Sequence, residues 1–182
     1  MNTMNNIIKL PDRLKAISGY IDAGASVADI GTDHGFLPVY LAQSGLASRV
    51  IASDISAGSL KAAKRTADKY VVSEKIEFIN APGLDGIAPA DVDTIVITGL
   101  GGETITGILN NAAWTRNKNI KLILQPQSKI DVLFKFLYNN GYMIRLTTSV
   151  REKGRSYTVV LAAGCDPCEA QRHAACNSSH RL

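Results

Sequence analysis

The run ADIGTDHGFLPVYLA, residues 28–42, decides how this chain of 182 residues folds. It begins as the end of an apolar strand, breaks into small and polar residues, and continues as an amphipathic helical pattern. Two acids, Asp29 and Asp33, and one histidine, His34, lie at the break. A strand, a tight turn and a helix in this order predict the first unit of a parallel α/β sheet.

The same alternation of apolar strands and helical patterns continues along the chain. Strands are expected at residues 26–31, 49–56, 75–81, 93–102 and 120–127, and an antiparallel hairpin at 143–163. Helices are expected at residues 11–21, 37–45, 58–72, 102–111 and 128–142. The pattern therefore predicts one α/β domain with seven strands, most of them parallel.

Composition and charge exclude several classes of protein. No apolar run is long enough to cross a bilayer, and the polar start MNTMNNIIKL lacks the apolar core of a signal peptide. We therefore expect a cytoplasmic protein with no membrane partner. The net charge of +4 permits a nucleic-acid partner but does not by itself argue for one.

The end of the chain differs from the rest, and we expect a domain over residues 1–163 and a tail over 164–182. The tail has no apolar periodicity but holds five residues of the kinds that bind zinc: Cys165, Cys168, His173, Cys176 and His180. Short cysteine and histidine tracts often match zinc motifs by chance, and the later spacing does not fit a zinc knuckle. A disordered tail without metal is the favoured interpretation.

The loop after the first strand predicts a ligand site. Ligands of open parallel sheets bind beyond the carboxyl ends of the strands, and Gly31 permits a tight turn there. Asp54 follows the loop by about twenty residues, the spacing at which an acid accepts the hydroxyls of a ribose. The loop lacks GxGxxG and P-loop lysine, so S-adenosylmethionine fits better than a phosphate ligand. The alternative is that Asp29 and Asp33 only cap the next helix.

Two further motifs end strands at the same edge of the sheet. TGLGG, residues 98–102, places three glycines where a flat base could lie against the backbone, or forms a tight turn. LILQPQ, residues 122–127, ends in Gln125 and Gln127, which either bind a base or satisfy loop backbone. His34 either carries a proton or is a capping or packing residue at the helix start.

In this order, VADIGTDHGFLPVYLA, the acid of ASDIS, GLDGI, ITGLGGETI and LILQPQ resemble the bacterial TrmK family. The resemblance covers residues 7–162. It implies a Rossmann-like class I methyltransferase fold, a seven-stranded, mostly parallel sheet with a final antiparallel strand and helices on both faces. It also implies an enzyme that methylates N1 of adenine 22 in tRNA and uses S-adenosylmethionine as its cofactor.

The resemblance assigns roles to particular residues. Those implied to bind the cofactor are Asp29, Gly31, Thr32, Asp33, His34, Asp54, Ile55, Gly83, Leu84 and Gly99. Those implied to bind the target base are Leu100, Gly101 and Gly102, with Gln125 as a candidate from its position. Asp29 is the first catalytic candidate and Asp33 the second, because a carboxylate near the base favours the cationic product. Ala81 and Pro82 stand where the family usually has Gly-Asp.

Candidate phosphate contacts and alternatives complete the expectations. Basic groups that we expect near the catalytic edge are Lys9, Arg13, Arg116, Lys118, Arg151, Lys153 and Arg155. We expect a monomer with tRNA as its partner. The rival hypotheses are a methyltransferase for a small molecule or protein, a cofactor-binding protein without turnover, and a nicotinamide-dependent oxidoreductase, which the missing GxGxxG disfavours.

Overall fold

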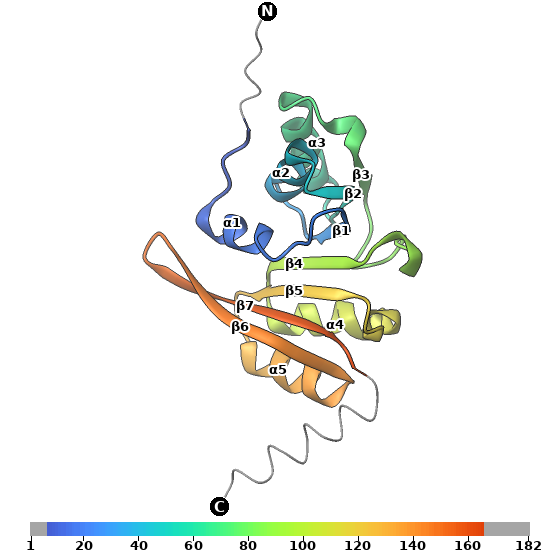
Figure 1. Ribbon diagram of the computed structural model, residues 1–182, viewed down its shortest axis with the longest axis vertical. Coiled ribbons are helices and arrows are strands. Elements are labelled where there is room, and N and C mark those ends of the chain that lie inside the picture. Colours follow the sequence, from blue (N-terminus) through green and yellow to red (C-terminus); the bar gives the residue numbers. More distant parts are fainter. Residues whose placement is uncertain (1–6, 166–182) are drawn as a thin grey trace, which may run out of the picture.

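The computed structural model describes residues 7–165, and these form one α/β sheet with helices around it (Figure 1). The strands are β1 (Ala25–Ile30), β2 (Ala47–Ser53), β3 (Ile76–Ile79), β4 (Thr94–Leu100), β5 (Lys121–Pro126), β6 (Tyr142–Glu152) and β7 (Arg155–Gly164). Their order in the sheet is β3-β2-β1-β4-β5-β7-β6. Only β7 runs antiparallel to its neighbours, so the expected sheet of seven strands with a final antiparallel strand is confirmed.

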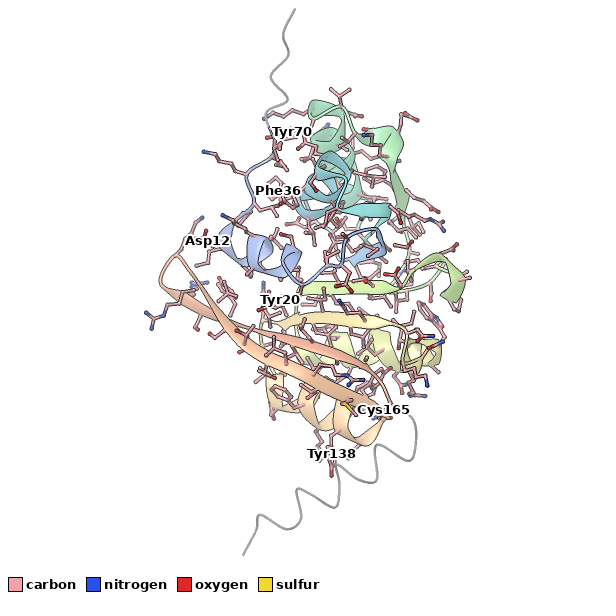
Figure 2. The ribbon with its side chains drawn as sticks, in the orientation of Figure 1. Asp12, Tyr20, Phe36, Tyr70, Tyr138 and Cys165 are labelled. Carbon is pink, nitrogen blue, oxygen red and sulfur yellow. The ribbon has the colours of Figure 1, made fainter. Side chains whose placement is uncertain are left out.

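Helices cover both faces of the sheet, as expected, and side chains pack on each side (Figure 2). The helices are α1 (Asp12–Ser18), α2 (Phe36–Ser44), α3 (Ala57–Lys69), α4 (Gly102–Asn111) and α5 (Ile130–Asn139), with short 3₁₀ turns at Ser73–Lys75, Pro89–Asp91 and Ala113–Arg116. No helix within residues 7–165 is long and apolar enough to cross a membrane.

Side chains alternate between the two faces of the sheet along each strand, so the core consists of two clusters, one on each face. In β5, Leu122 and Leu124 join the cluster that holds α4 and α5, whereas Ile123 joins the cluster that holds α1, α2 and α3. In β1, Ala28 faces the first cluster. Successive side chains of a strand point to opposite faces, so Asp29 and Gln125 point to the face that α1 covers.

The carboxyl ends of β1 and β4 form the point where the strand order reverses. β1 pairs with β2 on one side and with β4 on the other, and both pairs are parallel. β2, which follows β1 in the sequence, lies on one side of the β1–β4 pair, and β5, which follows β4, lies on the other side. The loops after β1 and β4 therefore diverge. A crevice forms at such a point in open α/β sheets, which locates the expected ligand site.

The β6–β7 hairpin extends past the rest of the sheet toward α1 (Figure 1). β5 pairs with β7 only over residues 160–163, whereas β6 and β7 stay paired as far as Glu152 and Arg155. The outer half of the hairpin rests on α1, where the backbone N–H of Arg13 donates to Glu152 Oε2 at 2.9 Å. The hairpin thus reaches the edge of the sheet where the parallel strands have their carboxyl ends.

The end of the chain is described only in part. β7 continues to Gly164, one residue past the expected domain boundary, and the Cys165 N–H donates to the Gly141 carbonyl at 3.0 Å. Cys165 lies at the end of β7, well away from Phe36 at the start of α2 (Figure 2). The other four candidate zinc ligands, Cys168, His173, Cys176 and His180, lie outside the described residues.

A close backbone approach joins the start of α4 to the segment between β5 and α5. The Gly102 N–H donates to the Ser128 carbonyl at 2.8 Å. A Cβ atom at Gly102 would lie 2.1 Å from the carbonyl oxygen of Lys129, so no side chain fits at this position. At Gly101 a Cβ would lie 3.2 Å from Ser128 Oγ. The consecutive glycines therefore let two backbone segments touch.

We expect Gly102→Ala to lower the free energy of unfolding by about 1–3 kcal/mol, because the added methyl group overpacks two rigid backbones. Gly107→Ala is the matched control, since it lies in the same helix and a Cβ there meets nothing within 4 Å. The control should instead gain up to about 1 kcal/mol from helix propensity. Urea denaturation measures both changes, and equal stability of the two variants would contradict the close approach.

Candidate active site

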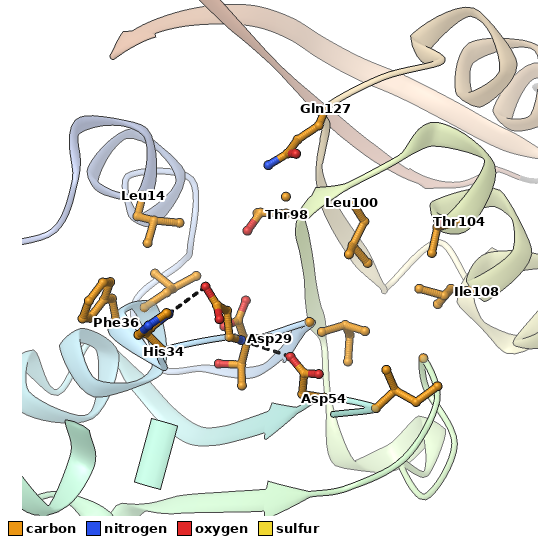
Figure 3. Close-up of a pocket in the computed structure, with 18 of the residues that line it drawn as sticks. Leu14, Asp29, His34, Phe36, Asp54, Thr98, Leu100, Thr104, Ile108 and Gln127 are labelled. Atoms are coloured by element: carbon orange, nitrogen blue, oxygen red, sulfur yellow. Dashed lines mark hydrogen bonds and ion pairs between the residues drawn. The ribbon is translucent and has the colours of Figure 1, made fainter. Parts of the chain in front are cut away.

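A cavity of about 540 Å³ opens at the carboxyl ends of β1, β2 and β4 (Figure 3). Ten of the predicted site residues line it: Asp29, Gly31, Thr32, Asp33, His34, Asp54, Ile55, Gly83, Gly99 and Leu100. Four predicted residues do not line it: Leu84, Gly101, Gly102 and Gln125. Motifs far apart in the sequence therefore meet around one cavity, although the role of each residue stays a prediction.

Two backbone hydrogen bonds tie the loop after β1 to the end of β2. The N–H groups of Gly31 and Thr32 both donate to the Ser53 carbonyl, at 2.8 and 3.1 Å. Gly31 has a φ of 74° and Asp33 a φ of 51°, so the chain makes its tight turn in the left-handed region. Gly35 ends the turn. A Cβ atom at this position would lie 2.8 Å from the Ala63 side chain, so the glycine allows α3 to approach the loop.

Asp54 is held at the cavity by backbone donors. Its Oδ2 accepts from the Asp33 N–H at 3.1 Å, and its Oδ1 accepts from the Ser56 N–H at 2.8 Å. The Asn80 side chain donates to the Asp54 carbonyl at 2.8 Å and secures the backbone. Each carboxylate oxygen keeps a second lone pair, so the group can accept two hydroxyl donors from a ligand in the cavity.

Asp29 is a buried acid, with only 4% of its surface exposed. The pKa of its carboxyl group is raised to about 7, chiefly by burial and in smaller part by the nearby charge of Asp54. The Thr32 side chain and the Arg13 guanidinium act in the opposite direction on this pKa. Near neutral pH the group therefore exists both as an acid and as a carboxylate, which is typical of functional sites.

His34 lies at the mouth of the cavity beside Asp33 and Phe36 (Figure 3). Its Nδ1 lies 2.8 Å from Asp33 Oδ2, and both side chains are more than half exposed. The imidazole stacks on the Phe36 ring with 5.7 Å between ring centres. These two contacts orient the imidazole. Its role as a proton carrier stays a prediction, beside the packing role that its stacking on Phe36 represents.

Arg13 reaches the cavity from α1. The sequence predicted it only as one of several candidate phosphate contacts. Its Nη1 donates to Gln125 Oε1 at 2.6 Å, and the same oxygen accepts from the Gly99 N–H at 3.3 Å. Gln125 is fully buried because its place in β5 points it under α1. The structure thus places Gln125 as a link between Arg13 and Gly99, and its contact with a base stays a prediction.

The apolar walls of the cavity also escaped the sequence analysis. They consist of Pro11, Leu14, Ile30, Phe36, Leu37, Ala81, Pro82 and Ile108, and the threonines Thr98 and Thr104 also line the cavity. Gln127, a candidate for base binding, lines the cavity from the segment after β5 (Figure 3). Helical periodicity indicated that Leu14 faces inward, but no local signal indicated that it faces a ligand site.

The strand order, the fixed acid after β2 and the cavity at the β1–β4 reversal define a Rossmann-like methyltransferase. A family described as a methyltransferase domain matches residues 10–160. Within that class the chain belongs to the TrmK family, which the comparison with a curated relative supports. That relative, the tRNA (adenine(22)-N(1))-methyltransferase of Bacillus subtilis, is 34% identical over 161 residues, or 88% of this chain and 68% of the relative.

Solved structures agree with this placement. The crystal structure of the B. subtilis m1A22 tRNA methyltransferase TrmK has a TM-score of 0.82 at 34% identity, covering 87% of this chain and 68% of that one. A putative tRNA (m1A22) methyltransferase from Streptococcus pneumoniae, in complex with S-adenosyl-L-methionine, has a TM-score of 0.80 at 27% identity. That match covers 90% of this chain and 78% of the other.

We expect Asp29→Asn to change how stability depends on pH. A carboxyl group whose pKa rises from 3.8 to about 7 on folding stabilises the folded state below pH 4 and loses this contribution as pH rises through 7. The variant cannot titrate there, so its stability relative to the wild type should increase between about pH 4 and 8, by at most about 4 kcal/mol. Urea denaturation across this range measures the difference.

Asp33→Asn provides the control, because it removes an exposed carboxyl group from the same loop. If the difference between the wild type and Asp29→Asn stayed constant across the whole pH range, the buried acid would not titrate as described.

Proposed function

We propose that this chain transfers the methyl group of S-adenosylmethionine to N1 of adenine 22 in tRNA, in the cytoplasm. The observation that carries the proposal is the pairing of a fixed acid, Asp54, with a buried acid, Asp29, in one cavity of a TrmK-family chain. The B. subtilis relative bears this activity in its name. The monomeric state expected from the sequence stays a prediction.

The cavity fits the proposed cofactor in size and chemistry. Its volume of about 540 Å³ lies within the range of small-molecule sites. The Asp54 carboxylate is oriented to accept the ribose hydroxyls, and the neighbouring Ile55, 73% exposed, offers an apolar surface for the adenine ring. Thr32 lines the same cavity, and its buried side chain acts on the neighbouring Asp29 carboxyl group.

The charges around the cavity suit a cationic ligand better than a phosphate. Asp29, Asp33 and Asp54 all line it, whereas Arg13 is the single Lys or Arg among its described lining residues. Arg13 already donates to Gln125. S-adenosylmethionine carries an ammonium and a sulfonium group, and when bound it supplies an electrophilic methyl group.

The residues of the site would act by alignment and electrostatics. N1 of adenine has a free lone pair at neutral pH, so the site needs no strong base to activate it. Leu14, Leu100 and Ile108 present apolar surface that keeps water away from the reacting atoms. A carboxylate at Asp29 would stabilise the positive charge that the methylated base acquires. The Gln127 amide, which faces the cavity, could form hydrogen bonds with the edge of the adenine.

The first experiment is methyl transfer from labelled S-adenosylmethionine to unmodified bacterial tRNA, followed by nucleoside analysis. We expect the label in N1-methyladenosine, and no transfer to a tRNA in which adenine 22 is replaced by guanine. Label in another nucleoside, in protein or in a small molecule would show that the substrate is not the proposed one. If the protein bound the cofactor but transferred no methyl group, it would be a cofactor-binding protein without turnover.

A second measurement tests the cofactor site by itself. Asp54→Asn removes the charge that holds two backbone N–H groups and two ribose hydroxyls, so affinity for S-adenosylmethionine should fall about tenfold to hundredfold. Asp131→Asn, an exposed position on α5 outside the cavity, is the control. Isothermal titration calorimetry compares the three proteins, and unchanged affinity of Asp54→Asn would contradict the ribose assignment.

A further inference from the structure

A second groove of about 500 Å³ lies beside the catalytic cavity, between the segment that joins β5 to α5 and the start of β7. Its lining residues are Pro126, Gln127, Ser128, Lys129, Ile130, Arg155, Ser156, Tyr157 and Thr158. Gln127 lines both the groove and the cavity. A polymeric ligand that lies in the groove can therefore place its next monomer in the catalytic cavity.

The groove is cationic and rich in hydroxyl groups. Lys129 and Arg155 stand on its two sides, both exposed, and no acidic residue lines it. Neither cation forms an ion pair with any residue in the part of the chain that the structure describes. Ser128, Ser156 and Thr158 add donors between them. This combination suits an anionic ligand with hydroxyl groups, such as a ribose-phosphate chain.

Tyr157 connects the groove to the catalytic cavity through Arg13. The guanidinium carbon of Arg13 lies 5.3 Å from the centre of the Tyr157 ring, within the range of a cation–π contact. Arg13 lines the cavity and Tyr157 lines the groove, so one stacked pair forms part of the wall between them. Glu152 of the hairpin also accepts from the Arg13 backbone N–H, which fixes α1 and the hairpin together.

The ITGLGG segment does not line the groove but packs behind its Gln127–Lys129 side. Gly102 approaches the Lys129 carbonyl more closely than any side chain would permit, and the Gln127 N–H donates to the Leu100 carbonyl at 2.8 Å. Lys129 itself has a φ of 54°, a strained conformation for a residue with a side chain. The surrounding contacts therefore impose the position of Lys129, and strain of this kind concentrates at functional sites.

We infer that this groove binds the ribose-phosphate backbone of the nucleotides that flank the target adenine, with Lys129 and Arg155 contacting phosphates. The inference rests on the proposed function, and it assigns the substrate path for that same site. It also gives Gly101 and Gly102 a role different from direct contact with the base. They shape the groove by allowing the Ser128–Lys129 segment to approach α4.

The test is the binding of labelled unmodified tRNA as a function of salt, with the double variant Lys129→Gln/Arg155→Gln. Each lost phosphate contact should reduce the slope of log K against log salt by about 0.7–0.9, so the double variant should lose about 1.4–1.8. At about 0.1 M salt its affinity for tRNA should fall tenfold or more. Affinity for S-adenosylmethionine, measured by calorimetry, should stay at the wild-type value.

The matched control is Lys75→Gln/Arg145→Gln, which removes one lysine and one arginine from exposed positions in other grooves of the molecule. We expect the control to retain the affinity and the salt slope of the wild type. Equal losses in both double variants would mean that net charge alone attracts tRNA, and no loss in Lys129→Gln/Arg155→Gln would mean that tRNA lies elsewhere. Either result would overturn the inference.

The same proteins separate the inference from the proposed function. If the wild type forms N1-methyladenosine in tRNA but the groove variant binds tRNA like the control, only the groove assignment fails. If the wild type neither binds tRNA nor methylates it, the proposed function fails and the groove assignment fails with it.

Discussion

The site depends on the two hydrogen bonds by which Gly31 and Thr32 donate to the Ser53 carbonyl. They hold the loop after β1 against the end of β2, and this places the Asp33 N–H next to the Asp54 carboxylate. Three acids consequently line one small cavity, and their mutual repulsion opposes that arrangement. The fold accommodates it by letting the most buried acid, Asp29, take up a proton, because burial and Asp54 both raise its pKa.

Glycines serve the molecule here chiefly by allowing backbones to approach one another. Gly35 lets α3 approach the loop after β1, and Gly102 lets the start of α4 touch the Lys129 carbonyl. Gly99 is different, because its φ of 78° turns the chain and its N–H donates to Gln125. A motif of three neighbouring glycines therefore combines two physical tasks, and only Gly99 performs its task at the cavity.

Local patterns in the sequence predicted the parts of the structure that local physics determines. The strand, turn and helix around Asp29 and the acid at Asp54 follow from periodicity and spacing, and so does the edge where they meet. The predicted strand at 93–102 was too long, because Gly101 caps α4 instead of continuing β4. The Arg13–Gln125 contact joins residues 112 positions apart. Which buried partner Gln125 finds depends on how α1 packs, and no local signal encodes that.

The cavity and the groove place opposite electrostatic demands on neighbouring parts of one edge. In the cavity Asp54 is fixed by backbone donors and Asp29 is buried, so salt screens Asp29 weakly and pH controls its charge. Lys129 and Arg155 are exposed, so salt controls their attraction for phosphate. Arg13 lies between these regions, because it faces Asp29, donates to Gln125 and stacks on Tyr157. Its fixed position separates the acids that suit a cationic cofactor from the cations that suit an anionic nucleic acid, so each ligand meets the charge that attracts it.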